Sequence, residues 1–494
     1  MKVSEYYHIA LKQSSLEFVD VDTYSDTKVY IDPKALRDID SPWAQECVAL
    51  LQTFFSAVLR AIQSEDKTKA LGLLGHLNEP NETRLGVSKN KASGRAVGTE
   101  LSTDIWRALT ESAAAASGLL EDLEDTALLI EHIGFDLVSD MTTNIIRSQL
   151  IEFTHRMCEK YPTITKEDEV YPGPVWDRRS EKWTTNYTDL PVADGRVLIL
   201  VPKSIVRRNK LTFDPGEYMA QYILPKLMSD ELSNNSSLVH VLKSGEHRVY
   251  KNAVRKKHGI EKQSKDDSSP VRSSKSLSLE VTLEHPEILD DYRAAKSQST
   301  PPLTNNDLSE LTESEPPDWD KLLNDVVTIE PGKPNATKYH LAVEALFSAL
   351  FFPALDYMKH EYKLDPTGRK RVDITYTNIA RDGFFDWVNR VVGAPAHEVY
   401  IECKNYAKDV GNPELDQIRG RFSDFRSNLG FMVFRSTSDK QRIIEGCKDT
   451  AHGGHGFIIA LDDNDLRLLV EERKHNEQNI MFEFLRNRYA ELVS

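Results

Sequence analysis

Two stretches in the last third of the chain decide the fold: Arg371-Val-Asp-Ile-Thr-Tyr376 and Glu398-Val-Tyr-Ile-Glu-Cys-Lys-Asn-Tyr406. Both are rich in β-branched and aromatic residues and are bounded by turn-forming residues, so both are predicted to be strands. Side chains alternate along a strand, so Glu402 and Lys404 share one face and Cys403 lies on the other. Burying a carboxylate and an ammonium on an apolar strand is costly unless they pair or bind a metal. These two charges are therefore candidate functional residues.

A metal site is the chemistry that these strands suggest. Asp373 lies midway along the first strand and supplies a second carboxylate if the two strands pair. Two carboxylates and one backbone carbonyl make a hard oxygen site that suits Mg²⁺, which keeps several of its waters. Lys404 would then orient or polarise a water at this site. The alternative is that Glu402 and Lys404 form a solvated pair on an edge strand, although their neighbours along the strand are apolar.

The pattern resembles the P-D-(D/E)-x-K nuclease superfamily, which has the restriction-endonuclease-like fold, and within it the Mrr-like branch. The resemblance covers residues 338–462. Beyond the three charges it includes Glu344, on an apolar helix ahead of the first strand, and Gly368, five residues before Asp373. It also includes Gln417, in a predicted helix that follows the second strand.

The order of the expected elements agrees with this family. After the helix with Gln417 come a predicted strand at Gly430-Phe-Met-Val-Phe434, a helix from Asp439 to Thr450 and a strand at Gly456-Phe-Ile-Ile-Ala-Leu461. The resemblance implies an αβββαβ core with a further helix and strand. We therefore expect an α/β C-terminal domain with a central mixed sheet flanked by helices, and a mainly α N-terminal region.

The sequence departs from the family pattern at two places. Val372 stands where the name of the motif has proline, which removes no ligand. The separation of 29 positions between Asp373 and Glu402 exceeds a simple hairpin and contains a predicted helical insertion at residues 382–392. This insertion leaves open whether the two strands pair directly.

The resemblance implies a metal-dependent endonuclease that hydrolyses phosphodiester bonds, with DNA expected as the substrate rather than RNA. The cofactor would be Mg²⁺, and Mn²⁺ would substitute for it. The implied metal ligands are Asp373, Glu402, the backbone carbonyl of Cys403 and Glu344. Lys404 would position the attacking water and stabilise the developing charge, and Gln417 would orient a water or Lys404. The rival hypothesis is a non-enzymatic nucleic-acid-binding or adaptor protein with an inactive nuclease fold.

The composition of the whole chain is ordinary for a water-soluble protein. Of 494 residues, 28% are charged and 40% hydrophobic, which leaves room for two or three domains. No apolar run is long enough to span a bilayer, and the start lacks an apolar signal segment. Four scattered cysteines indicate reduced thiols. A cytoplasmic protein with no membrane partner is therefore expected.

The charge distribution predicts where nucleic acid binds. A net charge of −15 argues against the whole surface as a nucleic-acid platform. From Arg369 to Arg442, however, 13 Lys or Arg residues exceed 10 Asp or Glu residues. A polyanion would meet this part of the chain. The domain organisation, a large N-terminal half joined to an Mrr-like nuclease, also resembles that of bacterial defence nucleases. This resemblance implies a homo-oligomer or a defence-system partner protein.

We expect four segments along the chain. They are a mainly helical N-terminal domain (residues 1–160), an α+β extension (161–242), a basic arm and flexible linker (243–320), and the nuclease domain with a closing C-terminal helix (321–494). The linker prediction depends on residues 294–320, which are dense in Pro, Ser and acidic residues. Residues 243–275 either contact nucleic-acid backbone as a basic arm or form a solvated helix that runs into a Ser-rich stretch.

Two polar stretches of the N-terminal half leave alternatives open. Residues 78–98 form either a plain surface loop or a loop that grips phosphates through Lys89, Lys91 and Arg95. Ser139 or Asp140 is expected to cap the helix that follows. The alternative is a pocket or partner surface lined by Asp140, Thr143, Asn144 and Arg147.

Overall fold

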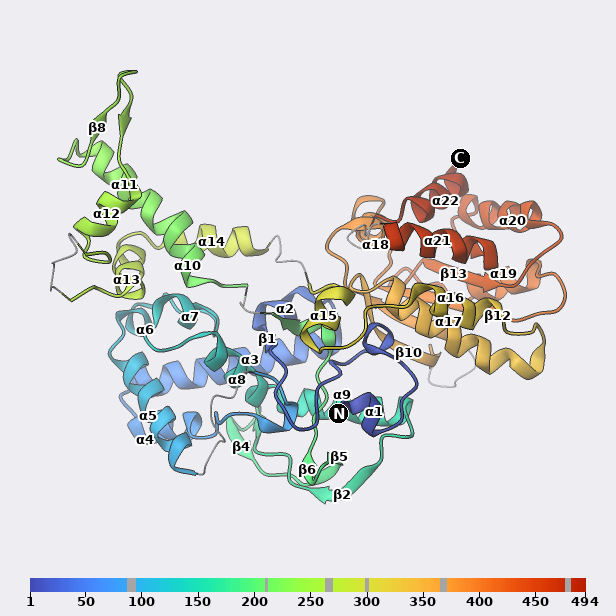
Figure 1. The fold of residues 1–494 in the computed structure, drawn as a ribbon, viewed down its shortest axis with the longest axis horizontal. Coiled ribbons are helices and arrows are strands. Elements are labelled where there is room, and N and C mark those ends of the chain that lie inside the picture. Colours follow the sequence, from blue (N-terminus) through green and yellow to red (C-terminus); the bar gives the residue numbers. More distant parts are fainter. Residues whose placement is uncertain (87–94, 209–211, 263–269, 298–301, 365–370, 476–480) are drawn as a thin grey trace.

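The structure, a computed structural model, describes residues 1–86, 95–208, 212–262, 270–297, 302–364, 371–475 and 481–494. Two lobes lie side by side, and a projection extends from the first of them (Figure 1). Each lobe has its own hydrophobic core, one drawn from residues 3–308 and the other from residues 323–492. Phe352 and Tyr357 of the second lobe enter the first core, so the two lobes pack against each other.

The N-terminal lobe is mainly helical. Its longest helix, α3 (Pro42–Gln63), has apolar residues at helical spacing and buries Leu51, Phe54 and Val58. The other helices are α1 (Val3–Tyr6), α2 (Pro33–Asp38), α4 (Lys67–Leu74), α5 (Arg95–Thr110), α6 (Ala113–Ser117), α7 (Asp125–Leu129), α8 (Phe135–Ile145) and α9 (Arg147–Lys160). The strands are β1 (Tyr30–Ile31), β2 (Lys166–Val170), β3 (Val175–Asp177), β4 (Lys182–Thr184), β5 (Thr188–Ala193), β6 (Arg196–Val197) and β7 (Val206–Arg207).

The predicted helix cap at Ser139 or Asp140 is wrong, because α8 begins one turn earlier and runs through both residues. Ser139 Oγ instead accepts a hydrogen bond of 3.0 Å from the Ile31 amide. Asn144 Nδ2 donates to the Asn78 carbonyl at 2.6 Å. The polar side chains of α8 therefore tie this helix to β1 and to the loop at Asn78. Lys89 and Lys91 of the phosphate-loop alternative lie outside the described residues, as does the side chain of Arg95.

The projection contains the segment predicted as a basic arm. It is built from α10 (Pro215–Tyr218), a π-helical turn (Met219–Ile223), α11 (Leu224–Ser233), β8 (His240–Val241), β9 (His247–Arg248), α12 (Lys251–Lys257), α13 (Ser274–Glu284) and α14 (Glu287–Ser297). Within it Lys257 pairs with Glu231 at 2.5 Å, and Arg255 with Glu261 at 3.4 Å. Part of the basic charge is therefore neutralised inside the projection itself.

Residues 294–320, predicted as a flexible linker, include the helix α15 (Asn305–Leu311). Asn305 and Leu308 are fully buried, and Asn305 Nδ2 donates a 2.8 Å hydrogen bond to the Ala349 carbonyl in the second lobe. This helix is therefore packed against both lobes, which the composition of the stretch did not predict. The division between the two hydrophobic cores follows α15, between residues 308 and 323.

A five-stranded mixed sheet forms the centre of the C-terminal lobe. Its order is β10 (Leu355–Lys363), β11 (Arg371–Asn378), β12 (Glu398–Lys404), β13 (Leu429–Phe434) and β14 (Phe457–Leu461). The first three strands are antiparallel, and β12, β13 and β14 are parallel. The expected central mixed sheet is confirmed, and β11 and β12 pair directly, with Ile374 opposite Ile401.

Helices cover both faces of this sheet. Phe431 of β13 packs against Phe347 of α17 on one face. Its neighbour Gly430 faces α19, where a Cβ atom would lie 2.7 Å from Ile418 Cδ1, so a larger residue would require the Ile418 side chain to shift. The helices are α16 (Trp319–Val327), α17 (Ala336–Leu350), α18 (Gly383–Asp386) with a π-helical turn (Trp387–Val391), α19 (Asn412–Arg419), α20 (Lys440–His452), α21 (Asp463–His475) and α22 (Glu483–Val493).

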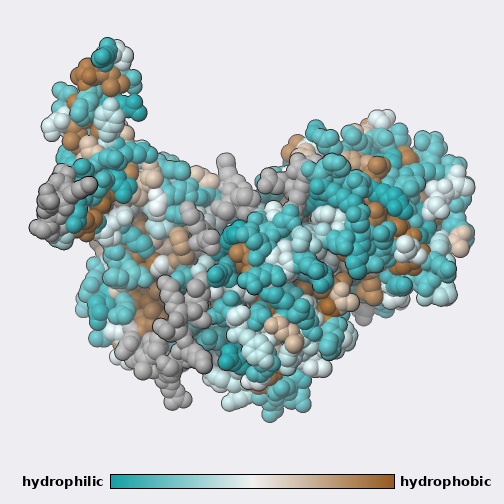
Figure 2. Space-filling view, viewed as in Figure 1, coloured by the Kyte–Doolittle hydropathy of each residue, from teal (hydrophilic) through white to brown (hydrophobic). Residues whose placement is uncertain are grey.

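The surface is mostly hydrophilic on the face shown in Figure 2, with small hydrophobic patches. One such patch lies near the tip of the projection, the segment to which the exposed Val241 and Tyr250 belong. In the described part of the chain, no helix has both the length and the apolar composition that crossing a bilayer requires. The four cysteines are buried free thiols.

Candidate active site

The pairing of β11 with β12 brings Asp373 to Glu402 and Lys404. Beyond the last ladder pair, Ile374 with Ile401, the Cys403 amide donates a 2.8 Å hydrogen bond to Asp373 Oδ2. Lys404 Nζ donates to Glu402 Oε2 at 3.2 Å. The two strands therefore hold three charged side chains where their backbone ladder ends.

The helix α19 adds Gln417 to this cluster. Pro413 lies in the first turn, and the Glu414 carboxylate accepts a 2.9 Å hydrogen bond from the Gly411 amide, which fixes where the helix begins. One turn later, Gln417 Oε1 accepts a 2.8 Å hydrogen bond from Lys404 Nζ. The ammonium is thus held between a carboxylate on its own strand and an amide on the covering helix.

Glu402 is a buried carboxylate with only one of its oxygens satisfied. Its side chain has no exposed area, and Oε1 has no hydrogen-bond partner among the described residues. Arg421 Nε lies 4.0 Å from Oε1, the outer limit of an ion pair and too far for a hydrogen bond. Burial and the adjacent Asp373 carboxylate raise the pKa of Glu402 to about 7, against the opposing effect of Lys404. This oxygen is the least satisfied group of the cluster.

Lys404 is almost completely buried, yet it keeps its charge. Burial favours the neutral amine, but Glu402 and Asp373 together raise the pKa of Lys404 above its ordinary value. Asp373, in contrast, leaves 25% of its side chain exposed. The cluster is therefore open to solvent at Asp373 and closed at Glu402 and Lys404.

Residues 8–214 match one protein-family model. It is described as a domain of unknown function (DUF8370). No curated protein and no solved structure matches the chain. The matched segment lies within the N-terminal lobe and includes none of the C-terminal sheet.

His340 is a member of the cluster that the sequence did not single out. Its Nε2 lies 3.1 Å from the Cys403 carbonyl oxygen, within hydrogen-bonding distance, and 3.8 Å from Asp373 Oδ2. The sequence could have indicated His340 through the helical repeat, because it lies four residues before Glu344 and so on the same face of α17.

Glu344 does not join the other predicted site residues. Its Oε1 lies 2.9 Å from Lys160 Nζ of the N-terminal lobe, and its Oε2 lies 3.2 Å from His360 Nδ1 of β10. Despite burial, Lys160 and His360 lower the pKa of Glu344. Gly368, also part of the family pattern, lies outside the described residues.

The oxygen atoms of the Asp373 and Glu402 carboxylates and of the Cys403 carbonyl are ligands of the kind that a hard divalent cation prefers. Among the described residues no three His, Cys, Asp or Glu side chains gather in a way that could hold a metal ion. A magnesium site needs fewer, because waters complete its coordination. The unpaired Glu402 Oε1 beside Asp373 is the kind of buried oxygen that such a cation would satisfy. The Cys403 carbonyl could join them if His340 releases it.

Proposed function

We propose that the C-terminal lobe is a Mg²⁺-dependent endonuclease of the restriction-endonuclease-like type and that its substrate is DNA. The observation that carries the proposal is the incomplete pairing of Glu402. An oxygen that is buried, beside a second carboxylate and without a hydrogen bond is costly in a purely structural cluster. A divalent cation would remove that cost.

The order of the elements supports the same proposal. Apart from the helical insertion with α18 between β11 and β12, the elements come in the αβββαβ order implied by the family resemblance: α17, β10, β11, β12, α19 and β13. The three antiparallel strands and the parallel fourth strand place the charged cluster at the ends of β11 and β12. Fold alone does not establish chemistry, so the proposal depends mainly on the cluster.

Each residue of the cluster has a distinct role in the proposed reaction. Asp373 and Glu402 would hold the cation, which would polarise a phosphate oxygen and offset its developing charge. Lys404 would orient the attacking water and stabilise the negative charge of the transition state through its ammonium. Gln417 holds Lys404 in place through the 2.8 Å hydrogen bond, so the ammonium needs little reorganisation during the reaction.

Basic side chains near the cluster favour a nucleic-acid substrate. Arg371 begins β11, Arg419 ends α19 and Arg421 follows that helix. The side chains of Arg371 and Arg419 are about half exposed. Guanidinium groups in such positions bind phosphate oxygens and release counterions from DNA.

Cleavage of supercoiled plasmid DNA by the full chain tests the proposal. We expect nicking that requires Mg²⁺ or Mn²⁺. The Lys404→Ala and Asp373→Ala variants should each lose it by at least about a hundredfold, because charge stabilisation in a site of this kind contributes roughly 3 kcal/mol. The Asp373→Ala variant should also bind Mg²⁺ more weakly in calorimetry, whereas Lys404→Ala should keep its affinity.

Lys408→Ala is the matched control. This exposed lysine follows the same strand by four residues and has no contact with the carboxylates among the described residues. It should leave cleavage unchanged. Undiminished nicking by Lys404→Ala would refute the assigned site. A wild-type chain that binds plasmid without cutting it in either metal would favour a non-enzymatic nucleic-acid-binding protein instead.

A further inference from the structure

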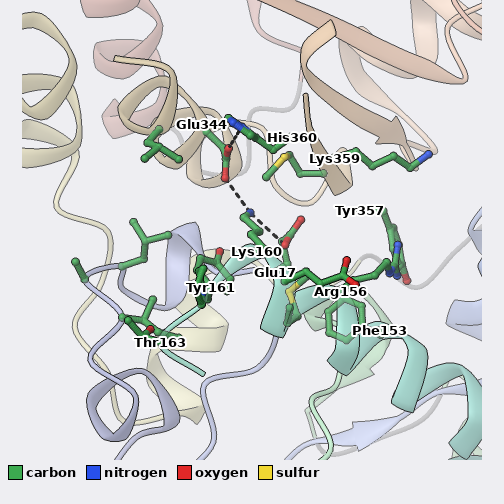
Figure 3. A pocket seen from close by; sticks show the side chains of 18 of the residues that line it. Glu17, Phe153, Arg156, Lys160, Tyr161, Thr163, Glu344, Tyr357, Lys359 and His360 are labelled. Carbon is green, nitrogen blue, oxygen red and sulfur yellow. Dashed lines mark hydrogen bonds and ion pairs between the residues drawn. The ribbon is translucent and has the colours of Figure 1, made fainter. Parts of the chain in front are cut away.

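A cavity of about 730 Å³ lies between the two lobes, and its charged side chains pair with one another (Figure 3). Lys160 lies 3.2 Å from Glu17 and 2.9 Å from Glu344. His360 lies 3.2 Å from the other oxygen of Glu344. These pairs are contacts between the lobes, and nothing in the described lining selects one class of ligand. A surface loop of the C-terminal lobe gives a more specific indication.

The loop between α19 and β13, residues 420–428, presents an aromatic ring to solvent. Phe425 is 92% exposed, the highest value for any large hydrophobic residue in the described part of the chain. Single exposed apolar residues are common on protein surfaces. The exposure of Phe425 therefore acquires meaning only from what holds the loop and from what surrounds the ring.

Backbone hydrogen bonds hold the loop in a closed turn. The Ser423 amide donates to the Ser427 carbonyl at 2.9 Å, and the Ser427 amide donates to the Ser423 carbonyl at 3.0 Å. Asn428 Nδ2 donates to Asp424 Oδ1 at 3.0 Å. Phe425 is the central residue of this turn. A ring on an ordered turn loses less conformational entropy when it binds than a ring on a loose segment.

Phe422 anchors the same loop on the sheet. Its ring stacks on Tyr400 of β12, with the ring centroids 6.3 Å apart and the planes 15° from parallel. A Cβ atom at Gly456 would lie 2.6 Å from Phe422 Cδ2, so this ring is packed closely against the start of β14. Of the two phenylalanines in the loop, one is packed and Phe425 faces solvent.

Two arginines of the loop contact the end of the sheet at which Asp373 lies. Arg421 Nε donates a 2.5 Å hydrogen bond to the carbonyl of Arg371, two residues before Asp373. Arg426 Nη1 donates a 3.2 Å hydrogen bond to the carbonyl of Leu364, which follows β10 next to the start of β11. The loop therefore borders the candidate active site.

The charge around the ring favours a nucleic-acid base over an apolar protein surface. Residues 419–428 contain three arginines and one aspartate, and Arg426, the neighbour of Phe425, is exposed. An apolar partner would cover guanidinium groups without supplying an anion. A nucleic-acid strand supplies both a flat base for the ring and phosphates for the arginines.

We propose that Phe425 stacks on an unpaired base of the DNA substrate and so adds affinity for DNA that contains unpaired bases. In a perfect duplex the neighbouring bases cover both faces of each base, so the ring can stack only on a base that has left the stack. The inference rests on the endonuclease function proposed above for its substrate class. Its test measures binding, which requires no cleavage.

Fluorescence anisotropy of the full chain in EDTA measures this binding in the absence of cleavage. The probes are a labelled DNA strand of mixed sequence and the perfect duplex of the same strand. Phe425→Ala should weaken binding to the single strand by about tenfold, because a contact between a base and an aromatic ring typically contributes that much or more. Its affinity for the perfect duplex should stay within about twofold of the wild type.

Further variants separate stacking from other effects. Phe425→Trp should keep the affinity for the single strand, whereas Phe425→Leu should lose it, because leucine is apolar but has no π face. Arg426→Gln should weaken binding to both probes and reduce its dependence on salt, which Phe425→Ala should leave unchanged. Leu468→Ala, a matched change of an exposed apolar residue on α21, should bind as the wild type does.

The proposal is overturned if Phe425→Ala or Phe425→Leu binds the single strand with wild-type affinity, if both probes lose equally, or if the wild type binds neither. A wild-type dimer that Phe425→Ala dissociates without a change in DNA binding would assign the ring to self-association. Plasmid nicking by a chain whose DNA binding ignores Phe425 would refute this inference alone. Selective loss of single-strand binding in a chain that cuts no plasmid would refute the nuclease function alone.

Discussion

Glu344 with Lys160 and Glu402 with Lys404 are both buried pairs of glutamate and lysine, and they differ in how completely the carboxylate is satisfied. At the interface between the lobes, both oxygens of Glu344 have cationic partners, Lys160 and His360. In the sheet, Glu402 has Lys404 on one oxygen, and in the described part of the chain its other oxygen has no hydrogen bond. The pKa of Glu344 is lowered despite its burial, whereas that of Glu402 is raised to about 7, by burial first.

This difference separates a structural pair from a candidate catalytic one. A fully paired buried carboxylate has nothing to gain from a further ligand, so Glu344 fits the role of an interlobe contact. A half-paired carboxylate next to another acid is unfavourable unless something positive completes it. The sequence alone assigned both glutamates to one metal site, and only their partners distinguish them.

The largest expected effect separates the two glutamates by activity. Glu402→Gln should lower plasmid cleavage by at least about a hundredfold, because it removes a charge that the proposed cation requires. Glu344→Gln should leave the rate within a few-fold of the wild type, measured at a temperature where both variants are folded. Equal losses of cleavage in the two variants would indicate that Glu344 is an active-site residue.

For stability, the interlobe pair should matter more than it does for cleavage. Lys160→Met leaves two buried carboxylates, Glu17 and Glu344, without their shared cation. Breaking such a pair typically costs roughly 3 kcal/mol or more, so the free energy of unfolding in urea should fall by about that amount. Lys474→Met removes a partly exposed lysine that pairs with Asp320 and Glu471 at the surface, and its effect should stay below about 1 kcal/mol because surface ion pairs contribute little. A negligible effect of Lys160→Met would mean that the interlobe pair is not structural.

The carboxylate of Asp140 extends the comparison to a partly buried group whose charged neighbours among the described residues are acids. Burial first, and then Glu79, Asp136 and Asp26, raise the pKa of Asp140 to about 8. Between about pH 4 and pH 8 the folded state therefore holds a proton that the unfolded state has lost, and stability falls as the pH rises.

Asp140→Asn should remove this loss of stability at high pH. We expect its free energy of unfolding to match that of the wild type near pH 4 and to exceed it at pH 9 by up to about 5 kcal/mol, because a pKa raised by roughly four units corresponds to about 1.4 kcal/mol per unit. Urea titrations across this pH range measure the difference. A constant difference at all pH values would show that the effect does not come from the ionisation of Asp140.

The smallest expected effect concerns His340, which links the two clusters through α17. His340→Phe removes the side chain that contacts the Cys403 carbonyl and lies near Asp373. We expect a change in cleavage rate of about tenfold or less, equivalent to roughly 1.4 kcal/mol. Plasmid cleavage over a range of Mg²⁺ concentrations would show whether the change lies in metal affinity or in turnover.

Much of the C-terminal lobe could be predicted from local sequence. Short runs rich in β-branched, aromatic and other apolar residues predicted β11, β12, β13 and β14. Asp439, which caps the first turn of α20, marked where that helix begins. The neighbourhood of Glu402 and Lys404 followed from their spacing on one strand. The strand β10 was not located, because its residues do not alternate cleanly and its pairing with β11 is interrupted by a bulge.

What the sequence by itself determined is therefore what neighbouring residues decide: strand faces, helix starts, and the adjacency of Glu402 with Lys404. Tertiary structure decided which distant groups meet. It paired β11 with β12 across the helical insertion, brought Gln417 to Lys404 and His340 to Cys403, and gave Glu344 the partner Lys160 from the other lobe. The physical reason is that a buried charge takes its pKa and its role from the groups around it, and those groups come from the whole fold.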